Sequence, residues 1–438
     1  MSSSLETSDY HSSLLRLLEI TSSPRLGLGR MQQLLQLCGN PQDSFESFHI
    51  AGTNGKGSVC AFLYEILRKA GVRVGMTTSP HLTSARERIQ FQGRLISEDE
   101  FCAAENVVFE AVQKMEDPPT FFERIVAMAF WTFQEQKINI AVVEVGLGGR
   151  LDATNVLQRP LAVGVSPIGI DHRNFLGETI EEIAGEKAGI IKEERPVVCG
   201  KQEPIARDVI RSVALEKRAP FVSLDDASVF QDVIQHLSLT QSPHPLPHEN
   251  RIGLLGKHQL DNAVTAALMV EHSELSISQD VISAGLCQTT WPGRFERISS
   301  SPPVFLDGAH NAAAANELTK SLRDHPSTKG KPIFLIWGAT RGHDVKETAQ
   351  AFDGPIAQCW AVQSQAPRSM SADMLAACLA REFSGQVSES SVKTALREAC
   401  AGAEAHGGIV VVTGSLYLVG EVRAHFVQMA TDPSLPEF

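Results

Sequence analysis

Apolar and polar positions alternate in blocks along the first half of the chain. Residues 48–51 and 72–77 are short apolar runs typical of buried strands, and helical spacing of apolar residues predicts a helix at 59–69 between them. A second helix, expected at 122–136, leads into 138–145, a nearly continuous β-branched run typical of a parallel strand covered on both faces. This succession of strand, helix and strand predicts an α/β fold.

The same rhythm continues to about residue 200 and is then interrupted. We expect a strand at 161–165, a helix at 179–188 and a strand at 196–199. Residues 227–251 are rich in Ser, Pro and His, and their apolar positions alternate. This segment predicts a loop or a hairpin excursion from the α/β series.

A second α/β series follows and ends near the C-terminus. Its predicted elements are strands at 304–306, 333–337, 356–362 and 409–412 and helices at 312–322 and 416–426. Between the two series, residues 298–303 read ISSSPP, a Ser/Pro composition that suits a linker. Because 438 residues are too many for a typical single domain, we predict two domains, at 1–297 and 303–438.

Composition narrows the class of protein. Hydrophobic residues make up 43% of the chain and charged residues 21%, the balance of a soluble globular protein with a large core. The net charge of −12 argues against binding to nucleic acid or to an anionic membrane. The N-terminus has no secretory pattern, no apolar run reaches the ~18 residues of a membrane span, and the eight cysteines form no paired motif. We therefore expect a cytoplasmic protein with free thiols.

The strongest chemical signal is AGTNGKGSV at residues 51–59, directly after a predicted strand and at the start of a helix. Its glycines let successive N–H groups point at phosphate oxygens, with the positive end of the helix dipole behind them. Lys56 supplies a mobile positive charge and Ser58 a hydroxyl for Mg²⁺. The glycine between them departs from the common Walker A motif, and a glycine-rich turn without a ligand is the alternative. The residues expected to contact ATP here are Thr53, Asn54, Gly55, Lys56, Gly57 and Ser58.

Glu144 lies at the end of the buried run IAVVEV. A carboxylate at the carboxyl end of a parallel strand, beside a phosphate loop, lies where α/β folds place their ligand chemistry. Since Mg²⁺ takes oxygen ligands and keeps several waters, Glu144 is a candidate magnesium ligand. A strand-end glutamate that faces solvent is the alternative.

Lys187 lies in TIEEIAGEKAGIIK, residues 179–192, where it shares the apolar side of a predicted helix with Ile183 and Ile190. A lysine buried there should lose its charge or gain a partner, because desolvation disfavours the ammonium form. Neutral lysine can react with carbon dioxide. A solvated lysine is the alternative.

The loop GTNGKGS resembles the nucleotide loop of the Mur ligase superfamily, and specifically that of its folate branch, the dihydrofolate synthases and folylpolyglutamate synthases. Peptidoglycan-branch members have a threonine pair after the lysine and a whole domain before the loop. The resemblance extends from about residue 18 to residue 422 in ordered blocks, which include TSPHL, TFFE, GLGGRLDATN, GIDHRNFLG, KHQLDNAVTAAL, WPGRFE, FLDGAHN and TGSLYLVGE. It implies an N-terminal P-loop ATPase-like domain with a parallel sheet and a smaller C-terminal Rossmann-like α/β domain for glutamate ligation.

The resemblance also implies roles for single residues around the nucleotide. The positions that match Mg²⁺ ligands, for one or two ions, are Ser58, Glu144, His172 and Lys187. Lys187 would serve as a carbamate, and the catalytic residues would be Lys56, Lys187 and His172. The positions that match contacts to adenine, phosphates and ribose are Asn262, Arg294 and Asp307, respectively. Arginine suits phosphates because its planar, permanently charged group matches their oxygens, and for Asn262 a polar helix face is the alternative.

Two further sets of positions match the acceptor and the amino acid. The acceptor positions are Thr120, Phe122, Asp152 and Ala153, and the glutamate positions are His310 and Ser415. An aromatic face can stack on a flat heterocycle, while a carboxylate accepts hydrogen bonds from its N–H groups. Phe122 could equally be part of a helix core.

The resemblance implies an ATP-dependent ligase that joins L-glutamate to dihydropteroate and to the γ-carboxylate of reduced folates through an acyl phosphate. The expected ligands are ATP, Mg²⁺, L-glutamate and either dihydropteroate or a reduced folate, and the resemblance implies a monomer. The alternatives are folylpolyglutamate synthase activity alone, another amide ligase of the Mur type, a P-loop kinase that stops at phosphoryl transfer, or a nucleotide-binding module without turnover.

Overall fold

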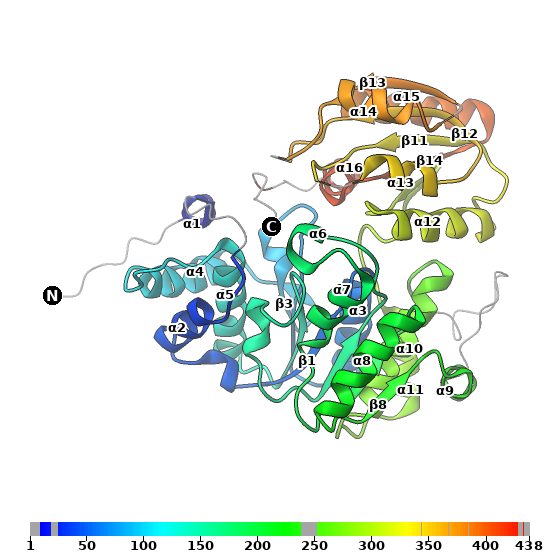
Figure 1. Ribbon diagram of the computed structural model, residues 1–438. Coiled ribbons are helices and arrows are strands. Elements are labelled where there is room, and N and C mark those ends of the chain that lie inside the picture. Colours follow the sequence, from blue (N-terminus) through cyan, green and yellow to red (C-terminus); the bar gives the residue numbers. More distant parts are fainter. Residues whose placement is uncertain are drawn as a thin grey trace.

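The computed structural model describes residues 9–18, 25–237, 252–342, 344–366, 368–383, 385–427 and 432. Its helices and strands form two units, each built around one β-sheet with helices packed on it (Figure 1). The first unit has an eight-stranded sheet and the second a six-stranded sheet. The predicted α/β class, with a larger N-terminal and a smaller C-terminal unit, is confirmed.

The first sheet is parallel at its centre. Its strands are β1 Glu46–Ala51, β2 Val74–Thr77, β3 Ile89–Phe91, β4 Arg94–Leu95, β5 Ile140–Glu144, β6 Ala162–Val165, β7 Val197–Cys199 and β8 Phe221–Ser223. They are ordered β4-β3-β2-β5-β1-β6-β7-β8, and the pairs β2–β3 and β3–β4 are antiparallel. The carboxyl ends of β1, β5 and β6 therefore meet at one edge, where α/β folds bind ligands.

Helices cover both faces of this sheet. They are α1 Tyr10–Leu18, α2 Gly29–Leu37, α3 Lys56–Lys69, α4 Glu98–Val112, α5 Phe121–Glu135, α6 Arg173–Leu176, α7 Ile180–Ala188, α8 Pro204–Glu216, α9 Ala227–His236, α10 Lys257–Glu271 and α11 Gln279–Gln288, with 3-10 turns at η1 Pro41–Asp43, η2 Ala85–Arg88 and η3 Ala153–Val156. One face of the sheet packs against α3, α10 and α11. The opposite face packs against α4 and α5 at one end of the strand order and against α7 and α8 at the other end. In the part of the chain that is described, no helix is long and apolar enough to cross a membrane.

The second sheet is parallel except at one edge. Its strands are β9 Glu296–Ser300, β10 Pro303–Leu306, β11 Ile333–Trp337, β12 Ile356–Val362, β13 Gln386–Ser390 and β14 Ile409–Thr413, in the order β13-β12-β11-β14-β10-β9. Its helices are α12 Ala312–Asp324, α13 Val345–Ala351, α14 Ala372–Leu379, α15 Val392–His406 and α16 Leu416–Val427. The first three share a core with one face, and α15 and α16 share a core with the other. Both α12 and α16 lie on the side of this unit that faces the first unit (Figure 1).

The segment predicted as a linker is part of the second sheet. Strand β9 pairs antiparallel with β10, so residues 298–303 form a hairpin and the linker interpretation is wrong. Because β9 is the edge strand, it has a single neighbour, and the polar serines and the prolines at the turn cost little there. The domain bounds 1–297 and 303–438 stay predictions.

The segment predicted as a loop or hairpin at 227–251 begins with a helix instead. Residues Ala227–His236 form α9, and the Asp226 carboxylate caps it by accepting a hydrogen bond from Ser228 N at 3.1 Å. The remainder of that segment, 238–251, lies outside the described residues. The first part of this segment therefore forms a short amphipathic helix, which its Ser/Pro/His composition did not indicate.

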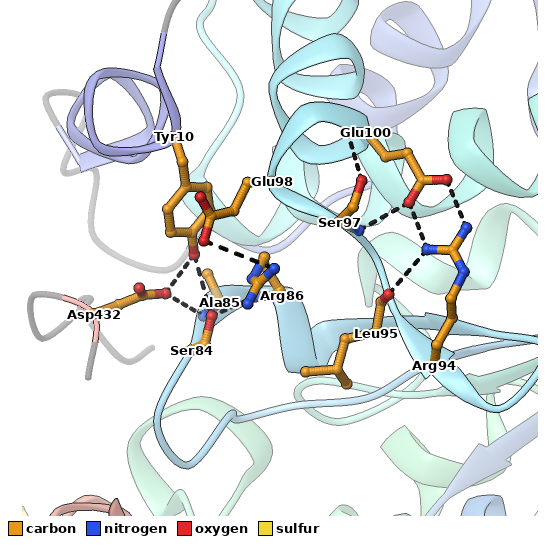
Figure 2. A network of polar contacts seen from close by, with 10 residues as sticks. All are labelled: Tyr10, Ser84, Ala85, Arg86, Arg94, Leu95, Ser97, Glu98, Glu100 and Asp432. Atoms are coloured by element: carbon orange, nitrogen blue, oxygen red, sulfur yellow. Dashed lines mark hydrogen bonds and ion pairs between the residues drawn. The ribbon is translucent and has the colours of Figure 1, made fainter. Parts of the chain in front are cut away.

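Asp432, near the end of the sequence, contacts residues of the first unit (Figure 2). Asp432 Oδ2 accepts hydrogen bonds from Tyr10 Oη at 2.5 Å and from Ala85 N at 2.7 Å. The backbone N–H of Asp432 donates to Thr83 O at 2.8 Å. Residues near both ends of the sequence thus hold the turn that begins η2.

Candidate active site

The phosphate loop follows β1 and leads into α3. Two of its glycines have positive φ, +147° at Gly52 and +85° at Gly55, a backbone region that other residues rarely adopt. A Cβ at Gly52 would lie 1.9 Å from Ser166 Oγ, and one at Gly55 would lie 2.6 Å from Asn262 Oδ1. Backbone conformation and close neighbours therefore both require glycine at these two positions.

Lys56 and Ser58 lie in the first turn of α3. The first N–H groups of a helix have no partner within it and carry the positive end of its dipole, so this end of α3 attracts phosphate. Lys56 Nζ donates to Gly52 O and Thr53 O, both at 3.2 Å, and the Ser58 side chain is buried. Thr53 Oγ1 donates in turn to Gly169 O at 3.0 Å. The loop is thus held in a compact conformation around a lysine ammonium.

Lys187 is buried on α7 and contacts the same loop. Its Nζ donates to Gly52 O at 2.8 Å. Burial and the positive charge of Lys56 lower the pKa of Lys187 to about 7, while the carboxylates of Asp171 and Asp152 oppose the shift. The solvated-lysine alternative is wrong, and the lowered pKa of Lys187 increases the share of neutral amine near neutral pH.

Glu144 ends β5 and is buried beside the loop. Its Oε2 accepts a hydrogen bond from Ser79 N at 3.0 Å. Burial raises the pKa of the Glu144 carboxyl, while the positive charges of Lys56 and Arg294 oppose that shift. The solvent-facing alternative is wrong. A buried carboxylate near two cations is instead a suitable ligand for a hard metal ion.

His172 is the most exposed of the predicted magnesium ligands. It has a left-handed backbone, φ +50°, at the N-cap of α6. Over the residues that the structure describes, no three His, Cys, Asp or Glu side chains are grouped so that they could hold a metal ion. Mg²⁺ is usually held by one or two carboxylates with substrate phosphates and waters, so Glu144 and Ser58 beside the phosphate loop fit this ion without such a group. The roles of Ser58, Glu144, His172 and Lys187 as ligands all stay predictions.

Asn262 lies on α10 directly against the phosphate loop. Its side chain is buried, and its Nδ2 donates to Gln259 Oε1 at 3.0 Å. Its Oδ1 is the atom that a Cβ at Gly55 would meet. Asn262 and Gln259 therefore form a polar face of α10 that is buried against the phosphate loop, and the contact of Asn262 to adenine stays a prediction.

Arg294 and Asp307 lie close together at the start of the second unit. A Cβ at Gly308 would lie 2.5 Å from Arg294 Nη1, so the guanidinium packs against the loop after β10. Asp307 accepts hydrogen bonds from Phe295 N at 2.8 Å and Ala309 N at 2.9 Å. Burial raises the pKa of the Asp307 carboxyl, and the Arg294 charge opposes that shift. Asp307 thus joins the backbone directly after Arg294 to the loop after β10, and the contacts of Arg294 to phosphates and of Asp307 to ribose stay predictions.

A pair of asparagines joins the phosphate loop to the second unit. Asn311 Nδ2 donates to Asn54 Oδ1 at 3.2 Å, and Asn54 Nδ2 donates to Asn311 Oδ1 at 3.4 Å. Asn311 also caps α12, because its Oδ1 accepts a hydrogen bond from Ala314 N at 2.9 Å. Sequence reasoning assigned no role to Asn311, although an asparagine directly before a helical run is an N-cap signal.

His310 and Ser415 lie in neighbouring loops at one edge of the second sheet. The loops are joined by Gly414 N, which donates to Ala309 O at 2.9 Å. His310 Nδ1 donates to Gly308 O at 2.8 Å. Ser415 Oγ is buried and has no hydrogen-bond partner among the described residues. Since an unpaired buried hydroxyl costs free energy, Ser415 is suited to meet a polar group of a ligand.

Phe122 and Asp152 meet in the loop that follows β5. Phe122 belongs to the core around α5, as the alternative for this residue predicts, and its ring covers Gly146, where a Cβ would lie 2.4 Å from Phe122 Cζ. Asp152 is buried, and its Oδ2 accepts a hydrogen bond from Leu147 N at 2.8 Å. Burial raises the pKa of the Asp152 carboxyl, and the hydrogen bonds that it accepts from Leu147 N and from Thr154 oppose the shift. The two side chains therefore lie against consecutive residues of this loop, Gly146 and Leu147.

Thr120 and Ala153 flank this pair at the starts of α5 and η3. Thr120 Oγ1 accepts a hydrogen bond from Glu123 N at 3.2 Å, and Thr120 N donates to Glu123 Oε2 at 2.6 Å, which together form a capping box. Ala153 is buried at the first position of η3. Both residues have a structural role in their own turn, and contact with an acceptor stays a prediction for each.

A cavity of about 600 Å³ lies beside α3 and is lined by residues of both units. Its walls include Tyr64, Gln90, Trp291, Arg294 and Leu416. Aromatic faces, amides and a cation are suited to an aromatic ring that carries an anionic group. The structure thus provides room for an organic anion next to a predicted phosphate contact.

The sequence profiles of two families match the chain. The Mur ligase middle domain matches residues 50–270, and the Mur ligase glutamate ligase domain matches residues 293–416. A curated dihydrofolate synthase/folylpolyglutamate synthase from Bacillus subtilis is 36% identical over 416 residues, covering 91% of this chain and 94% of that protein.

Solved structures share the fold along the whole chain. FolC from Escherichia coli in complex with DHPP and ADP has a TM-score of 0.83 at 30% identity, with 96% of this chain and 98% of that chain covered. A bifunctional folylpolyglutamate synthase/dihydrofolate synthase with Mn, AMPPNP and L-glutamate bound has a TM-score of 0.81 at 31% identity, with 97% and 99% covered. The chain therefore belongs to the Mur ligase family, and within it to the dihydrofolate synthase/folylpolyglutamate synthase branch.

Proposed function

We propose that this chain is an ATP-dependent ligase that joins L-glutamate to dihydropteroate and to the γ-carboxylate of reduced folates. The observation that carries the proposal is the group formed by Lys56, Lys187 and Glu144 around the phosphate loop, at the carboxyl ends of β1 and β5. The pair of Asn54 and Asn311 brings the second unit against that loop. Structural relatives that hold DHPP and ADP, or AMPPNP, Mn and L-glutamate, support the same set of ligands.

The two units divide the substrates between them. Residues 1–297 would bind ATP and the acceptor, because they carry the phosphate loop and the pair formed by Phe122 and Asp152. Residues 303–438 would place L-glutamate, with the unpaired Ser415 hydroxyl and His310 in adjacent loops as its contacts. A single chain then contains every required group, which agrees with a monomer.

Two successive displacements account for the amide bond. The acceptor carboxylate attacks the γ-phosphate in line and yields an acyl phosphate and ADP, while Lys56 and Arg294 balance the developing negative charge. The amine of L-glutamate then attacks the acyl carbon, and phosphate leaves with the electron pair of the C–O bond. Mg²⁺, held by Ser58 and Glu144 with His172 as a further ligand, would add positive charge at the phosphates. Water must be excluded between the units, since it would hydrolyse the acyl phosphate.

Lys187 would act as a carbamate in this reaction. Its neutral amine is the form that reacts with carbon dioxide, and its lowered pKa keeps that form populated. In carbamylation the neutral amine adds to the carbon of carbon dioxide and loses a proton to solvent, so an anion forms near Lys56 that attracts its ammonium group. The carbamate oxygens would also be available to a second Mg²⁺.

The test of the proposed function is whether ADP release needs both other substrates. We expect release only when ATP, Mg²⁺, L-glutamate and either dihydropteroate or a reduced folate are all present, and loss of release with excess EDTA. A kinase would release ADP with one acceptor and no L-glutamate. No ADP release with any acceptor would leave only a nucleotide-binding module.

The acceptor site should distinguish the two activities. Asp152→Ala and Phe122→Ala are expected to raise KM for dihydropteroate about tenfold or more, because each removes a hydrogen-bond or stacking contact to the heterocycle. The KM for reduced folates should rise less. In a reduced folate the reacting γ-carboxylate is further from the heterocycle than the reacting carboxylate of dihydropteroate, so the heterocycle must bind at another place. The cavity beside Arg294 has room for the heterocycle. Equal losses would assign both residues to a shared site or to the fold, and a wild type that uses one acceptor would disprove bifunctionality.

A further inference from the structure

A chain of three buried side chains connects the strand of the phosphate loop to the predicted acceptor carboxylate. His49 lies on β1, which ends in the phosphate loop, and its Nε2 is 2.8 Å from Thr154 Oγ1. Thr154 Oγ1 is in turn 2.5 Å from Asp152 Oδ1. All three side chains are buried, and His49 and Thr154 are fully inaccessible. No step of the proposed mechanism uses His49 or Thr154.

The direction of these hydrogen bonds follows from the number of protons available. Asp152 accepts hydrogen bonds from Thr154 N at 2.9 Å and from Leu147 N at 2.8 Å, and these donors favour the ionised carboxylate against the effect of burial; an ionised carboxylate only accepts. The single hydroxyl proton of Thr154 must therefore point to Asp152 Oδ1. The remaining polar contact of that hydroxyl is with His49, so His49 Nε2 must donate to Thr154 Oγ1.

The buried environment of His49 agrees with this tautomer. Burial and the charge of Lys192 lower the pKa of His49 to about 3, so its ring is neutral and carries one proton. Its Nδ1 is buried and has no hydrogen-bond partner among the described residues. With the proton on Nδ1, a buried N–H would be unpaired and Thr154 would have to give its proton to His49 instead of Asp152. The Nε2–H tautomer avoids both costs.

We propose that His49 is a positioning residue that fixes the Asp152 carboxylate for the acceptor heterocycle. It acts through the Thr154 hydroxyl, and the inference rests on the proposed role of Asp152 in the acceptor site. Because His49 belongs to the strand that carries the phosphate loop, the same contact fixes the distance between the acceptor carboxylate and the phosphates. A carboxylate whose orientation is set before binding loses less entropy when it meets its ligand.

The kinetic test uses matched pairs of variants that keep or remove one donor. His49→Gln keeps an N–H near the position of Nε2, whereas His49→Met fills a similar volume without it. Thr154→Ser keeps the hydroxyl, whereas Thr154→Val removes it at nearly constant shape. We expect His49→Met and Thr154→Val to raise KM for dihydropteroate about tenfold, the factor for one lost buried hydrogen bond, and to leave KM for ATP unchanged. His49→Gln and Thr154→Ser should keep a KM for dihydropteroate close to that of the wild type.

Several outcomes would overturn the inference. A folded His49→Met whose KM for dihydropteroate stays unchanged, or whose KM rises equally for ATP and dihydropteroate, would assign His49 to packing alone. Equal losses in His49→Gln and His49→Met would show that the ring, and not its N–H, matters. If both His49 variants fail to fold, the two Thr154 variants decide by the same criteria. A wild type without any dihydropteroate-dependent ADP release would disprove the proposed function itself, which separates that failure from this one.

A spectroscopic measurement tests the arrangement without turnover. In ¹⁵N-histidine-labelled wild type, the signal that is missing in His49→Gln should show the neutral Nε2–H tautomer and should not titrate between about pH 5 and 8. An Nδ1–H tautomer, or titration of that signal with an ordinary histidine pKa, would contradict the proposed chain of hydrogen bonds.

Discussion

Replacing Lys56 by alanine is expected to lower ATP turnover about 10³-fold while the protein remains folded, because one preorganised charge at the reacting phosphoryl group is lost. Among the described residues, the hydrogen bonds of Lys56 Nζ go to backbone oxygens of its own loop, Gly52 O and Thr53 O. The hydrogen bond from Lys187 to Gly52 O does not involve Lys56, so we expect the loop of the variant to keep it. The measurement is ADP release at saturating L-glutamate and acceptor, with thermal unfolding to confirm the fold.

An exposed lysine of the second unit provides the control. Lys346→Ala on α13 removes the same charge far along the sequence from the phosphate loop and should leave ADP release unchanged. Lys56→Ala should also raise the pKa of Lys187, because the charge of Lys56 is one cause of its lowered value. Near-normal turnover of a folded Lys56→Ala would disprove the phosphate-loop role.

Lys187→Ala is expected to lower turnover about 10² to 10³-fold, and formate or acetate should restore part of it. The physical reason is that the alanine variant vacates space in which a small carboxylate can take the place of the carbamate. Lys187→Met is the matched control, because its side chain fills that space and should give no rescue. The measurement is ADP release with and without each added carboxylate.

Carbamylation also predicts a dependence on pH and on dissolved carbon dioxide. Because the pKa of Lys187 is lowered to about 7, the reactive neutral amine dominates above that pH and is depleted below it. Wild type in carbon dioxide-depleted buffer should therefore gain activity on addition of bicarbonate, more strongly at pH 8 than at about pH 6. Full activity of a folded Lys187→Ala, or an unmodified amine in a crystal structure with nucleotide, would count against the carbamate.

Local pattern is sufficient for most of the fold. The apolar runs predict Ile333–Trp337 and Ile356–Val362 with their observed bounds, because buried parallel strands are continuous in sequence. The strand, glycine loop and helix around Lys56 are likewise contiguous, and turn chemistry alone indicates a phosphate site there. The prediction from local pattern is wrong at 298–303. An edge strand with one neighbour needs few apolar residues, so its sequence resembles that of a linker.

Local pattern does not fix the protonation or the pairing of the site residues, because both depend on segments that are distant in sequence. Lys187 reaches Gly52 across 135 positions, and its pKa is set by the burial and the neighbouring charge found there. Asn54 and Asn311 pair across 257 positions, and His49 and Thr154 across 105. The sequence by itself determined the fold class, the phosphate loop and the residue types that surround it. Only the tertiary structure decided that Glu144 and Lys187 are both buried beside that loop and that His49 contacts the Thr154 hydroxyl next to Asp152, because burial and side-chain contacts are properties of packed neighbours.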